Sequence, residues 1–502
     1  RRVPGAAERL PARKAAALAA IAGAFAYTVL AGFAVPAQRT FYMVSVVALA
    51  LWAGRIVAPL RVLAIALALV VLLDPWAPLA PGTWLSFGAV LVIFYASGGW
   101  SRPEPKLLQW ARVQWAITLG LAPAALFLFG QVSLAGPVAN ALAIPLVSGV
   151  VTPIALASAL VPLDFLLHAA AWLVQLLLQF LEWCAALPAA LWEQQVPPAW
   201  TVVLALGGVA WLLAPPGVPS RGAGIALVAP AFLVASDPPA QGEARISTLD
   251  VGQGLAVLVR TRNRALLYDA GPAYGSESDS GGRVVVPLLR ASGIRSLDAM
   301  VLTHDDSDHV GGAQTVLESV PVSAVFSSLA PAHGLHALAP AARACRAGLR
   351  WRWDGVAFEV LHPAGGAAPR RNDRSCVLRI TAGGASMLLT GDIERTAEAQ
   401  LLASGAALRS DAVLIPHHGS TTSSGAAFIA AVRPAWAIAS AGYRSRFGHP
   451  RPEVLARYRA AGATVLRTDL DGAVHVVLGR GGPRVTSERA LRARYWRQIP
   501  RV

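Results

Sequence analysis

The chain has 502 residues, of which 55% are hydrophobic and only 14% are charged, and its formal net charge at pH 7 is +15. A chain this long and this apolar is not expected to fold as one soluble domain. Length and composition therefore exclude a small soluble protein and indicate a membrane-embedded region beside a soluble one.

The first half of the chain, residues 1–236, predicts a polytopic α-helical membrane domain. Its long apolar runs match the roughly 20 residues that a helix needs to cross about 30 Å of hydrocarbon. The basic start RRVPGAAERLPARK leads into the first run without a cleavage site, which predicts a cytoplasmic flank rather than a signal peptide. We expect about nine transmembrane helices, near residues 15–35, 40–54, 58–74, 83–98, 110–130, 137–161, 165–190, 199–215 and 222–236.

Basic residues in the connecting loops predict the orientation of these spans. They gather in every second loop, at Arg1, Arg2, Arg9, Arg13, Lys14, Arg55, Arg61, Arg102, Lys106, Arg112 and Arg221. The alternate loops LLDPWAPLAPGT, GQVSLAG and LWEQQVPPAW contain neither Lys nor Arg. The positive-inside rule then predicts a multi-pass protein of the inner (plasma) membrane that starts in the cytoplasm, and an odd number of spans puts residues 240–502 outside.

Two polar residues within the membrane half stand apart from this pattern. Arg39, in VPAQRTFYM, is either an interfacial residue at a helix end or a cation that lines a path for an anionic polymer. Asn140 is a weaker candidate for the same path, because polar residues in spans often hydrogen-bond between helices.

The second half, residues 240–502, predicts an α/β domain that is soluble in water. Twelve short apolar or alternating segments read as strands, among them ARISTLDV, RALLYDAG, LDAMVLT and SMLLTGD. Helices are expected at 311–319, 393–404, 424–432 and 451–461. Hairpins of strands with helices between them favour an α/β sandwich with its sheets inside.

The three cysteines form no C-x-x-C pair and are too few for a disulfide framework. A bridge between Cys345 and Cys376 is not favoured by the sequence, but it stays possible.

A cluster of acids and histidines follows the strand LDAMVLT. The segment VLTHDDSDHVGG contains His304, Asp306, Asp308 and His309, a density that suits a metal centre better than a fold, because unpaired carboxylates repel one another. A solvated acidic loop is the alternative. Further strand-end loops supply Asp392, His417, His418 and His449, so that five of the ten histidines fall in three loops.

These residues predict two adjacent divalent cations and metal-assisted hydrolysis at phosphorus. Because the donors are aspartates and histidines without a thiolate, Mn²⁺ is favoured and Zn²⁺ is the alternative. The hydroxyls that begin at Ser420 either cap the next helix or hold a phosphate. Arg444 and Arg446 either neutralise phosphates of a polymer or form a solvated surface.

The motifs HDDSDH, DVGQG, DAG, TGD, HHGS and GHP, in this order, resemble the metallo-β-lactamase-like domain of ComEC-type competence proteins, the DNA-uptake channels of natural transformation. The segments GFAVPAQRTFYM, LLDPWAPLAPGTWLSFGAVLVIF and FGQVSLAGPVANALAIPL resemble the membrane domain of the same family. The resemblance implies an αββα sandwich. It also implies metal ligands at His304, Asp306, Asp308, His309 and Asp392 and active-site roles for Asp250, Asp269, Asn372, His417, His418 and His449. Of these we predict Asp308, His417 and His418 to be catalytic, His449 to be a further metal ligand, and Asp250, Asp269 and Asn372, together with Ser420, to be supporting residues.

The sequence departs from this family at several points. Asn372 stands where many relatives of the wider fold have another metal-binding His, and Leu255 follows DVGQG where many members have Asp. The chain also begins inside the membrane domain, so that the family's N-terminal spans and OB-like domain are either missing from a fragment or absent.

The resulting hypothesis is uptake of single-stranded DNA across the cytoplasmic membrane, with an external metal-dependent nuclease. The expected partners are DNA, the lipid bilayer and other competence proteins, and the oligomeric state stays open. One rival hypothesis is a membrane-anchored phosphodiesterase that acts on lipid or cell-wall phosphoesters. Another is a channel whose hydrolase domain is inactive.

Overall fold

The computed structural model describes residues 11–54, 58–98, 105–161, 164–215, 217–234, 238–330, 332–339, 341–364 and 371–493. The chain divides into two compact units, residues 1–236 and 237–502. Arg1, Arg2, Arg9, Arg55 and Arg102, on which the orientation prediction partly rests, lie outside the described residues.

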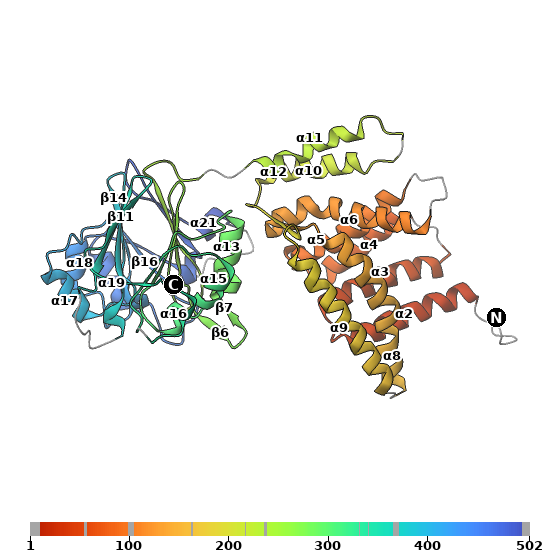
Figure 1. The fold of residues 1–502 in the computed structure, drawn as a ribbon, viewed down its shortest axis with the longest axis horizontal. Helices are drawn as coiled ribbons and strands as arrows, with labels where there is room; N and C mark the ends of the chain where they lie inside the picture. Colours follow the sequence, from red (N-terminus) through yellow and green to blue (C-terminus); the bar gives the residue numbers. More distant parts are fainter. Residues whose placement is uncertain are drawn as a thin grey trace. The chain divides into compact units, whose positions relative to one another are not determined.

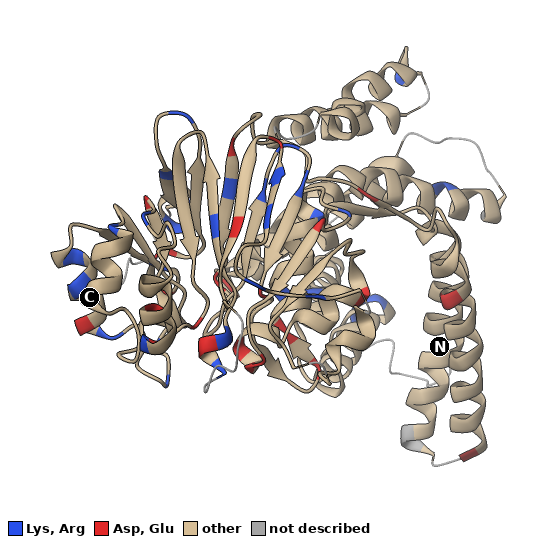
Figure 2. Cartoon of the chain, turned by 60° about the vertical axis from the view of Figure 1, so that its left-hand side comes forward, with Lys and Arg blue, Asp and Glu red and all other residues tan. Residues whose placement is uncertain are grey.

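The N-terminal unit is built almost entirely from helices (Figure 1). Proline stands in the first turn of α3, α4 and α5, where its missing N–H costs no helical hydrogen bond. Lys, Arg, Asp and Glu are sparse along these helices, as Figure 2 shows. The helices are α2 (Ala12–Leu30), α3 (Val35–Trp52), α4 (Pro59–Leu73), α5 (Pro81–Ser97), α6 (Lys106–Phe129), α7 (Gly136–Leu146), α8 (Thr152–Leu160), α9 (Asp164–Ala186), α10 (Ala199–Leu212), α11 (Gly224–Val228) and α12 (Pro230–Leu233).

Each of the nine predicted spans is helical, but their lengths differ from the prediction. Among the described residues, four helices are long and apolar enough to cross a membrane: Ala12–Leu30, Leu107–Phe129, Gly136–Ser158 and Asp164–Ala186. The helices Pro59–Leu73, Pro81–Ser97, Ala199–Leu212 and Arg221–Leu233 are apolar and shorter. Sequence hydropathy does not show where a helix ends, so a count of nine full spans is not supported.

Two of the loops without basic residues are joined by a small sheet. β1 (Gln131–Ser133) pairs in antiparallel fashion with β2 (Leu191–Glu193), so the predicted outer loops GQVSLAG and LWEQQVPPAW lie together. The side chain of Gln194 donates a hydrogen bond to the carbonyl of Ala231 at 2.7 Å. The helices α10 to α12 therefore form a hairpin that returns to the same end of the unit as β2.

Arg39 is buried within the helical unit, with 7% of its surface exposed. Its guanidinium donates to the Val35 carbonyl and to the Thr83 hydroxyl, both at 3.4 Å, and lies against Gly82 at the start of α5. No carboxylate of the described residues forms an ion pair with it. Arg39 is therefore a buried cation held by neutral groups, whereas Asn140 is exposed on α7.

The C-terminal unit is a sandwich of two mixed sheets with helices on both outer faces (Figure 1). The first sheet has the order β10-β9-β8-β5-β4-β3-β18-β19 and the second the order β11-β12-β13-β14-β15-β16-β17. The first contains β3 (Ala244–Thr248), β4 (Val257–Arg260), β5 (Ala265–Tyr268), β8 (Ala299–Leu302), β9 (Val325–Ser327), β10 (Arg343–Ala344), β18 (Val474–Leu478) and β19 (Arg484–Ser487). The second contains β11 (Arg350–Trp353), β12 (Val356–His362), β13 (Val377–Ala382), β14 (Ala385–Leu389), β15 (Ala412–Leu414), β16 (Trp436–Ala439) and β17 (Thr464–Arg467).

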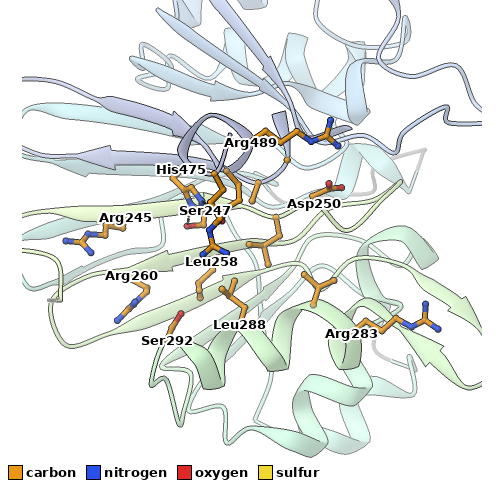
Figure 3. A pocket seen from close by; sticks show the side chains of 16 residues that line it. Arg245, Ser247, Asp250, Leu258, Arg260, Arg283, Leu288, Ser292, His475 and Arg489 are labelled. Carbon is orange, nitrogen blue, oxygen red and sulfur yellow. Dashed lines mark hydrogen bonds and ion pairs between the residues drawn. The ribbon is translucent and has the colours of Figure 1, made fainter. Parts of the chain in front are cut away.

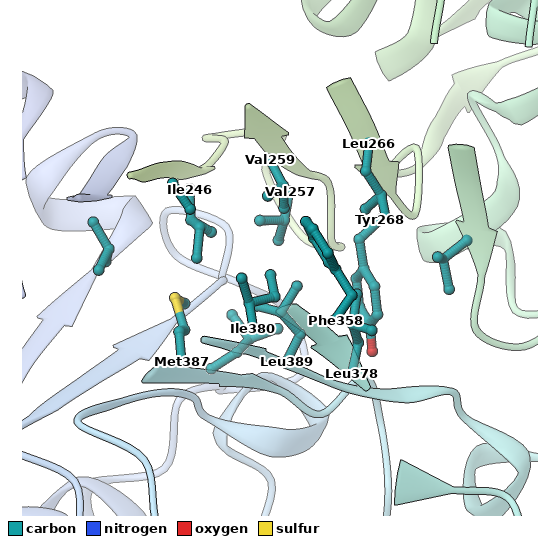
Figure 4. Packing of buried hydrophobic residues seen from close by; sticks show 14 of the residues in the cluster. Ile246, Val257, Val259, Leu266, Tyr268, Phe358, Leu378, Ile380, Met387 and Leu389 are labelled. Carbon is teal, nitrogen blue, oxygen red and sulfur yellow. The ribbon is translucent and has the colours of Figure 1, made fainter. Parts of the chain in front are cut away.

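Three apolar clusters hold the layers of this unit together. The first fills the space between the sheets, where Ile246 and Val257 face Ile380 and Leu389 (Figure 4). The second lies between the first sheet and the helices α13 (Val286–Ala291) and α15 (Ala313–Ser319). The third lies between the second sheet and the helices α17 (Arg395–Ala403), α18 (Ala426–Val432) and α19 (Pro452–Ala460). The order of layers is αββα, which confirms the predicted fold.

A disulfide joins Cys345, which follows β10, to Cys376, which precedes β13. Their Cα atoms are 6.0 Å apart, so the bridge ties the edge of the first sheet to the second. The bridge that the sequence left open but did not favour is therefore present. The two cysteines are 31 positions apart, and no spacing rule for so few cysteines indicates that the fold brings them together.

Candidate metal centre

Every residue of the centre follows the carboxyl end of a strand. β5 and β8 are parallel neighbours, and so are β14, β15 and β16, so their carboxyl ends lie at one edge of each sheet. Asp269 follows β5, His304 follows β8, Asp392 follows β14 and His418 follows β15. His309 lies on the short helix α14 (Ser307–Val310) after β8. In open α/β sheets this edge is the usual place for a ligand.

Three buried imidazoles are held in place through Nδ1. His304 Nδ1 lies 2.9 Å from the Thr303 hydroxyl, and His309 Nδ1 lies 2.7 Å from the carboxylate of Asp269. His418 Nδ1 donates to the carbonyl of Ser440 at 2.8 Å. A histidine that donates from Nδ1 keeps the lone pair of Nε2 free for a metal ion, and such partners fix both the tautomer and the ring orientation.

The Nε2 atoms converge on the carboxylates of Asp308 and Asp392. His309 Nε2 lies 3.2 Å from Asp392 and 3.2 Å from His418 Nε2, which in turn lies 3.2 Å from Asp308. The donor atoms form two groups, each within 4.8 Å, that share His309: one with His304 and Asp392, and one with Asp308 and His418. The groups support binding of divalent metal, and because His309 Nε2 has a single lone pair for one ion, the presence of two ions stays a prediction.

The charges in the centre are strongly coupled. Burial alone lowers the pKa of His309, but the carboxylates of Asp392 and Asp269 outweigh it and raise that pKa well above its usual range. Burial also opposes ionisation of Asp392, yet His309 and His418 hold the pKa of this carboxyl well below its ordinary value. The pKa of His418 is raised in the same way by Asp392 and Asp308 against the effect of burial.

The residues fit a divalent metal ion. His304 Nε2 is buried without a hydrogen-bond partner among the described residues, and its nearest carboxylate oxygen, on Asp306, is 3.5 Å away. A buried polar atom without a partner is costly and calls for an explanation, and a metal ligand is a sufficient one. Imidazole nitrogens and carboxylate oxygens without a thiolate suit zinc, manganese and other divalent ions.

Other predicted residues lie around the centre rather than inside it. Asp306 lies 3.5 Å from His304 Nε2 and 3.5 Å from Arg371 and is not part of either donor group, so its role as a ligand stays a prediction. His417 Nε2 is 3.9 Å from Asp392, and its ring packs edge to face on that of His449 at 5.8 Å between centroids. Burial, followed by the charges of His417 and His418, lowers the pKa of His449 to about 4. His418, rather than His417 or His449, therefore completes the second group.

Asn372, Asp250 and Leu255 lie outside both donor groups. The Asn372 amide reaches Glu394 at 3.4 Å and His417 at 3.5 Å. Asp250 is exposed and lines a separate groove. Leu255 packs in the core between the sheets and gives the centre no polar support.

Ser420 does not cap α18. The structure gives that helix Gly425 as its N-cap, without a side-chain hydrogen bond. The carboxylate of Glu398 instead accepts from the backbone N–H groups of Ser424 and Gly425. Because Glu398 already satisfies these donors, the segment offers them to no phosphate.

Several supporting residues were not predicted from the sequence. Thr303 gives its backbone N–H and its hydroxyl to Asp269, both at 2.8 Å, and Ser375 contacts His304 and accepts from the N–H of Asp392. Thr303 directly precedes the HDDSDH motif, and this position could have identified it as a supporting residue from the sequence. Ser440 acts through its carbonyl, which leaves no trace in a side-chain pattern.

The sandwich and its paired histidine and aspartate groups define a metal-dependent hydrolase that binds divalent metal. The model of the metallo-beta-lactamase superfamily matches residues 249–442, and the model named competence protein matches residues 1–218. The chain belongs to the family of ComEC-type competence proteins.

The similarity to one member spans nearly the whole chain. The chain is 40% identical to competence protein ComA of Neisseria gonorrhoeae over 98% of its length and 69% of that protein. It is also 31% identical to the uncharacterized protein YcaI of Escherichia coli over 92% of its length and 62% of YcaI. The metallo-beta-lactamase fold protein YhfI from Bacillus subtilis is similar over 45% of this chain and 96% of YhfI, at 12% identity and a TM-score of 0.32.

Proposed function

We propose that the chain imports one DNA strand across the inner membrane while its C-terminal unit hydrolyses DNA phosphodiesters outside the cytoplasm. The observation that carries the hydrolytic part is the pair of donor groups that share His309. Divalent ions held there supply the Lewis-acid chemistry that favours attack of water at phosphorus. Membership of the competence family supports the uptake part and, with it, other uptake proteins as partners.

The side chains around the centre suit the remaining steps of a hydrolysis. His417 is one-fifth exposed, and its Nδ1 is held by the Thr422 hydroxyl at 3.0 Å and by Glu394 at 3.4 Å. Its Nε2 therefore faces the centre, while the Glu394 carboxylate lies at Nδ1 on the other side of the ring. A histidine oriented in this way can donate a proton from Nε2 to the leaving oxygen. The exposed Arg444 and Arg446 line a pocket together with Asp308 and can neutralise phosphates next to the reacting one.

The donor set also bears on the choice of ion. The two donor groups contain three histidines and two aspartates, and no cysteine contributes to either. Imidazole nitrogens and carboxylates together suit Zn²⁺ as well as Mn²⁺, so the comparison of ions below decides which one works.

Two observations support an extracytoplasmic hydrolase unit. The hydrogen bond from Gln194 to Ala231 brings the end of the helical unit to the side of the loops that lack Lys and Arg. The Cys345–Cys376 disulfide suits an oxidising compartment, since cytosolic thiols are normally kept reduced. A reporter that is active only in the cytoplasm, fused after residue 240, should stay silent, and a strong signal would contradict this side.

The hydrolytic proposal is tested by incubating the purified chain with linear DNA and Mn²⁺, Zn²⁺, Mg²⁺ or a chelator. We expect metal-dependent cleavage that Asp392→Ala and His304→Ala each reduce at least about 100-fold with the fold intact, because each removes a ligand. Cleavage of small phosphodiesters but not of DNA would favour the membrane-anchored phosphodiesterase. Absence of any cleavage by a metal-loaded chain would favour a channel with an inactive hydrolase domain.

A further inference from the structure

A pocket of about 620 Å³ opens beside the metal centre. Four loops line it, which follow β3, β5, β8 and β16, so both sheets contribute to it. Asp308 is one of the lining residues, and its carboxylate lies 3.2 Å from His418 Nε2 in the second donor group. A ligand in this pocket therefore lies next to the place where a phosphodiester would be hydrolysed.

Three aromatic side chains that line this pocket, which we call the ring pocket, are exposed. Tyr274, Tyr443 and Phe447 are 44%, 59% and 48% exposed. Every other Tyr, Phe or Trp that the structure describes in the C-terminal unit is buried or half-buried. Exposed apolar groups that gather in one place mark a binding surface, whereas scattered ones do not.

The three rings are held in position by hydrogen bonds of their own loops. The Tyr274 hydroxyl donates to the carbonyl of Val251 at 2.8 Å. A turn fixes the loop of Tyr443 and Phe447, because the N–H of Ser445 donates to the carbonyl of Gly442 at 3.1 Å. The rings are therefore ordered before a ligand arrives, which lowers the entropy cost of binding.

Arginines lie on the faces of two of these rings. Arg444 lies over the Tyr443 ring at 5.4 Å, and Arg446 lies over the Phe447 ring at 4.8 Å. No carboxylate of the described residues forms an ion pair with either arginine, so both charges are available to phosphates. A planar guanidinium also stacks on a base, and rings interleaved with arginines are typical of surfaces that bind a single strand.

A series of rings leads from the ring pocket to the first donor group. Phe447 stacks on His449, with 6.1 Å between centroids and 27° between planes, and His449 packs edge to face on His417 at 5.8 Å. His417 Nε2 in turn lies 3.9 Å from Asp392. A base that stacks at Phe447 is therefore close to the histidine proposed as the proton donor.

A larger groove, of about 950 Å³, lies on the outer face of the first sheet between α13 and the short helix α21 (Glu488–Leu491), as Figure 3 shows. It shares no lining residue with the ring pocket, and no Tyr, Phe or Trp among the described residues lines it. The groove lacks both the rings and the link to Asp308, so the ring pocket is the better place for a substrate strand.

We propose that the ring pocket binds the unpaired bases of nucleotides next to the scissile phosphate, so that the C-terminal unit hydrolyses single-stranded rather than duplex DNA. In a duplex the faces of the bases are covered by neighbouring base pairs, and the rings have nothing to stack on. The proposal rests on the proposed nuclease function, since the shared Asp308 is what favours a DNA strand over other ligands.

The test measures binding without cleavage, by fluorescence anisotropy of a short labelled DNA strand on the whole chain in detergent and chelator. The variant Tyr443→Ala/Phe447→Ala should bind this strand at least about fivefold more weakly for each ring lost, because base stacking is worth at least that much. The slope of log affinity against log salt should not change, since the phosphate contacts remain.

A strand that is abasic at every position separates stacking from charge. Wild type and the alanine variant should bind the abasic strand equally, because neither can stack on it. The variant Tyr443→Trp/Phe447→Trp keeps a ring at both positions and should bind the normal strand like the wild type, which excludes a folding defect as the cause. The matched control, Leu338→Ala/Leu402→Ala, removes two exposed side chains outside the ring pocket and should also bind like the wild type.

Several results would overturn the proposal. One is unchanged affinity of the alanine variant for the normal strand, and another is an equal loss for the normal and the abasic strand. Hydroxyl-radical oxidation of Tyr443 and Phe447 should fall when the strand is added to the chain in vesicles; protection by the vesicles alone would assign the rings to the bilayer surface and refute the proposal.

The same experiments distinguish failure of the ring pocket from failure of the nuclease. Strand binding that depends on the rings, without cleavage under any metal, would refute the nuclease and leave the ring pocket standing. Cleavage of DNA by a chain whose strand affinity does not depend on the rings would refute the ring pocket and leave the nuclease standing.

Discussion

Replacement of Asp269 by asparagine should weaken metal binding without a direct change to any metal ligand. Asp269 is fully buried and accepts three hydrogen bonds, two from Thr303 and one from His309 Nδ1. An asparagine amide can still accept from the Thr303 N–H, but its NH₂ group then faces His309. To avoid two opposed donors, His309 must move its proton to Nε2, and the lone pair that faces Asp392 is lost.

The size of the effect follows from the role of such partners. Loss of an outer partner of a ligating histidine typically weakens metal binding 10- to 100-fold, or about 1.4 to 2.7 kcal/mol. His309 belongs to both donor groups, so metal binding should weaken whichever group holds the ion. The measurement is competition for metal between the purified chain and a chromophoric chelator, with circular dichroism to confirm the fold.

Asp354→Asn is a matched control for this prediction. Asp354 also has a positive φ, of 50° against 56° for Asp269, and also accepts from a threonine hydroxyl and a backbone N–H, of Thr261 and Asn263. It lies in a turn outside the metal centre, so its variant should bind metal like the wild type. Wild-type metal affinity in a folded Asp269→Asn chain would refute the role assigned to this carboxylate.

Three further predictions concern other parts of the molecule. The apparent metal affinity should fall as pH drops below the raised pKa values of His309 and His418, by about tenfold per unit for each proton displaced, which metal titration at several pH values checks. Replacement of Cys345 and Cys376 by serine should lower the free energy of unfolding by about 3–4 kcal/mol, measured by denaturant unfolding of the oxidised and variant chains. Arg39→Ala should lower transformation frequency at normal protein abundance and leave DNA hydrolysis unchanged, whereas the exposed Arg61→Ala should affect neither.

The layers of the C-terminal unit were predictable because the sequence of each predicted strand is itself apolar or alternating. All twelve predicted strands are present, since buried strands such as β14 read as continuous apolar runs. The edge strand β11 was missed because its sequence RWRW alternates arginine with tryptophan and has no aliphatic residue. Its Trp351 stacks on Phe326 and Phe358 at 5.3 and 5.1 Å, contacts that depend on the fold rather than on local preference.

The residue types of the centre were predictable from the sequence, but which of these residues form the donor groups was not. Strand-end loops rich in His and Asp indicated a metal centre. The choice between His417 and His418 depends on the backbone, because both residues have a positive φ, near 50°, which sends the two adjacent rings in different directions. Such conformations are costly for residues other than glycine and cluster at functional sites. Asp306 was assigned as a ligand by its motif; it lies 3.5 Å from both His304 Nε2 and Arg371, and its role as a ligand stays a prediction.

The proposed side of the membrane for the hydrolase unit has support other than the number of spans. A count of spans changes parity when one short helix, such as α10, fails to cross. The pairing of β1 with β2 and the Gln194–Ala231 hydrogen bond instead link α12, the last helix of the helical unit, to loops that lack Lys and Arg. If α10 to α12 only dip into the membrane as a hairpin, the chain still leaves them on that side. The contact therefore agrees with the proposed side, and it does not require α10 to cross the membrane completely.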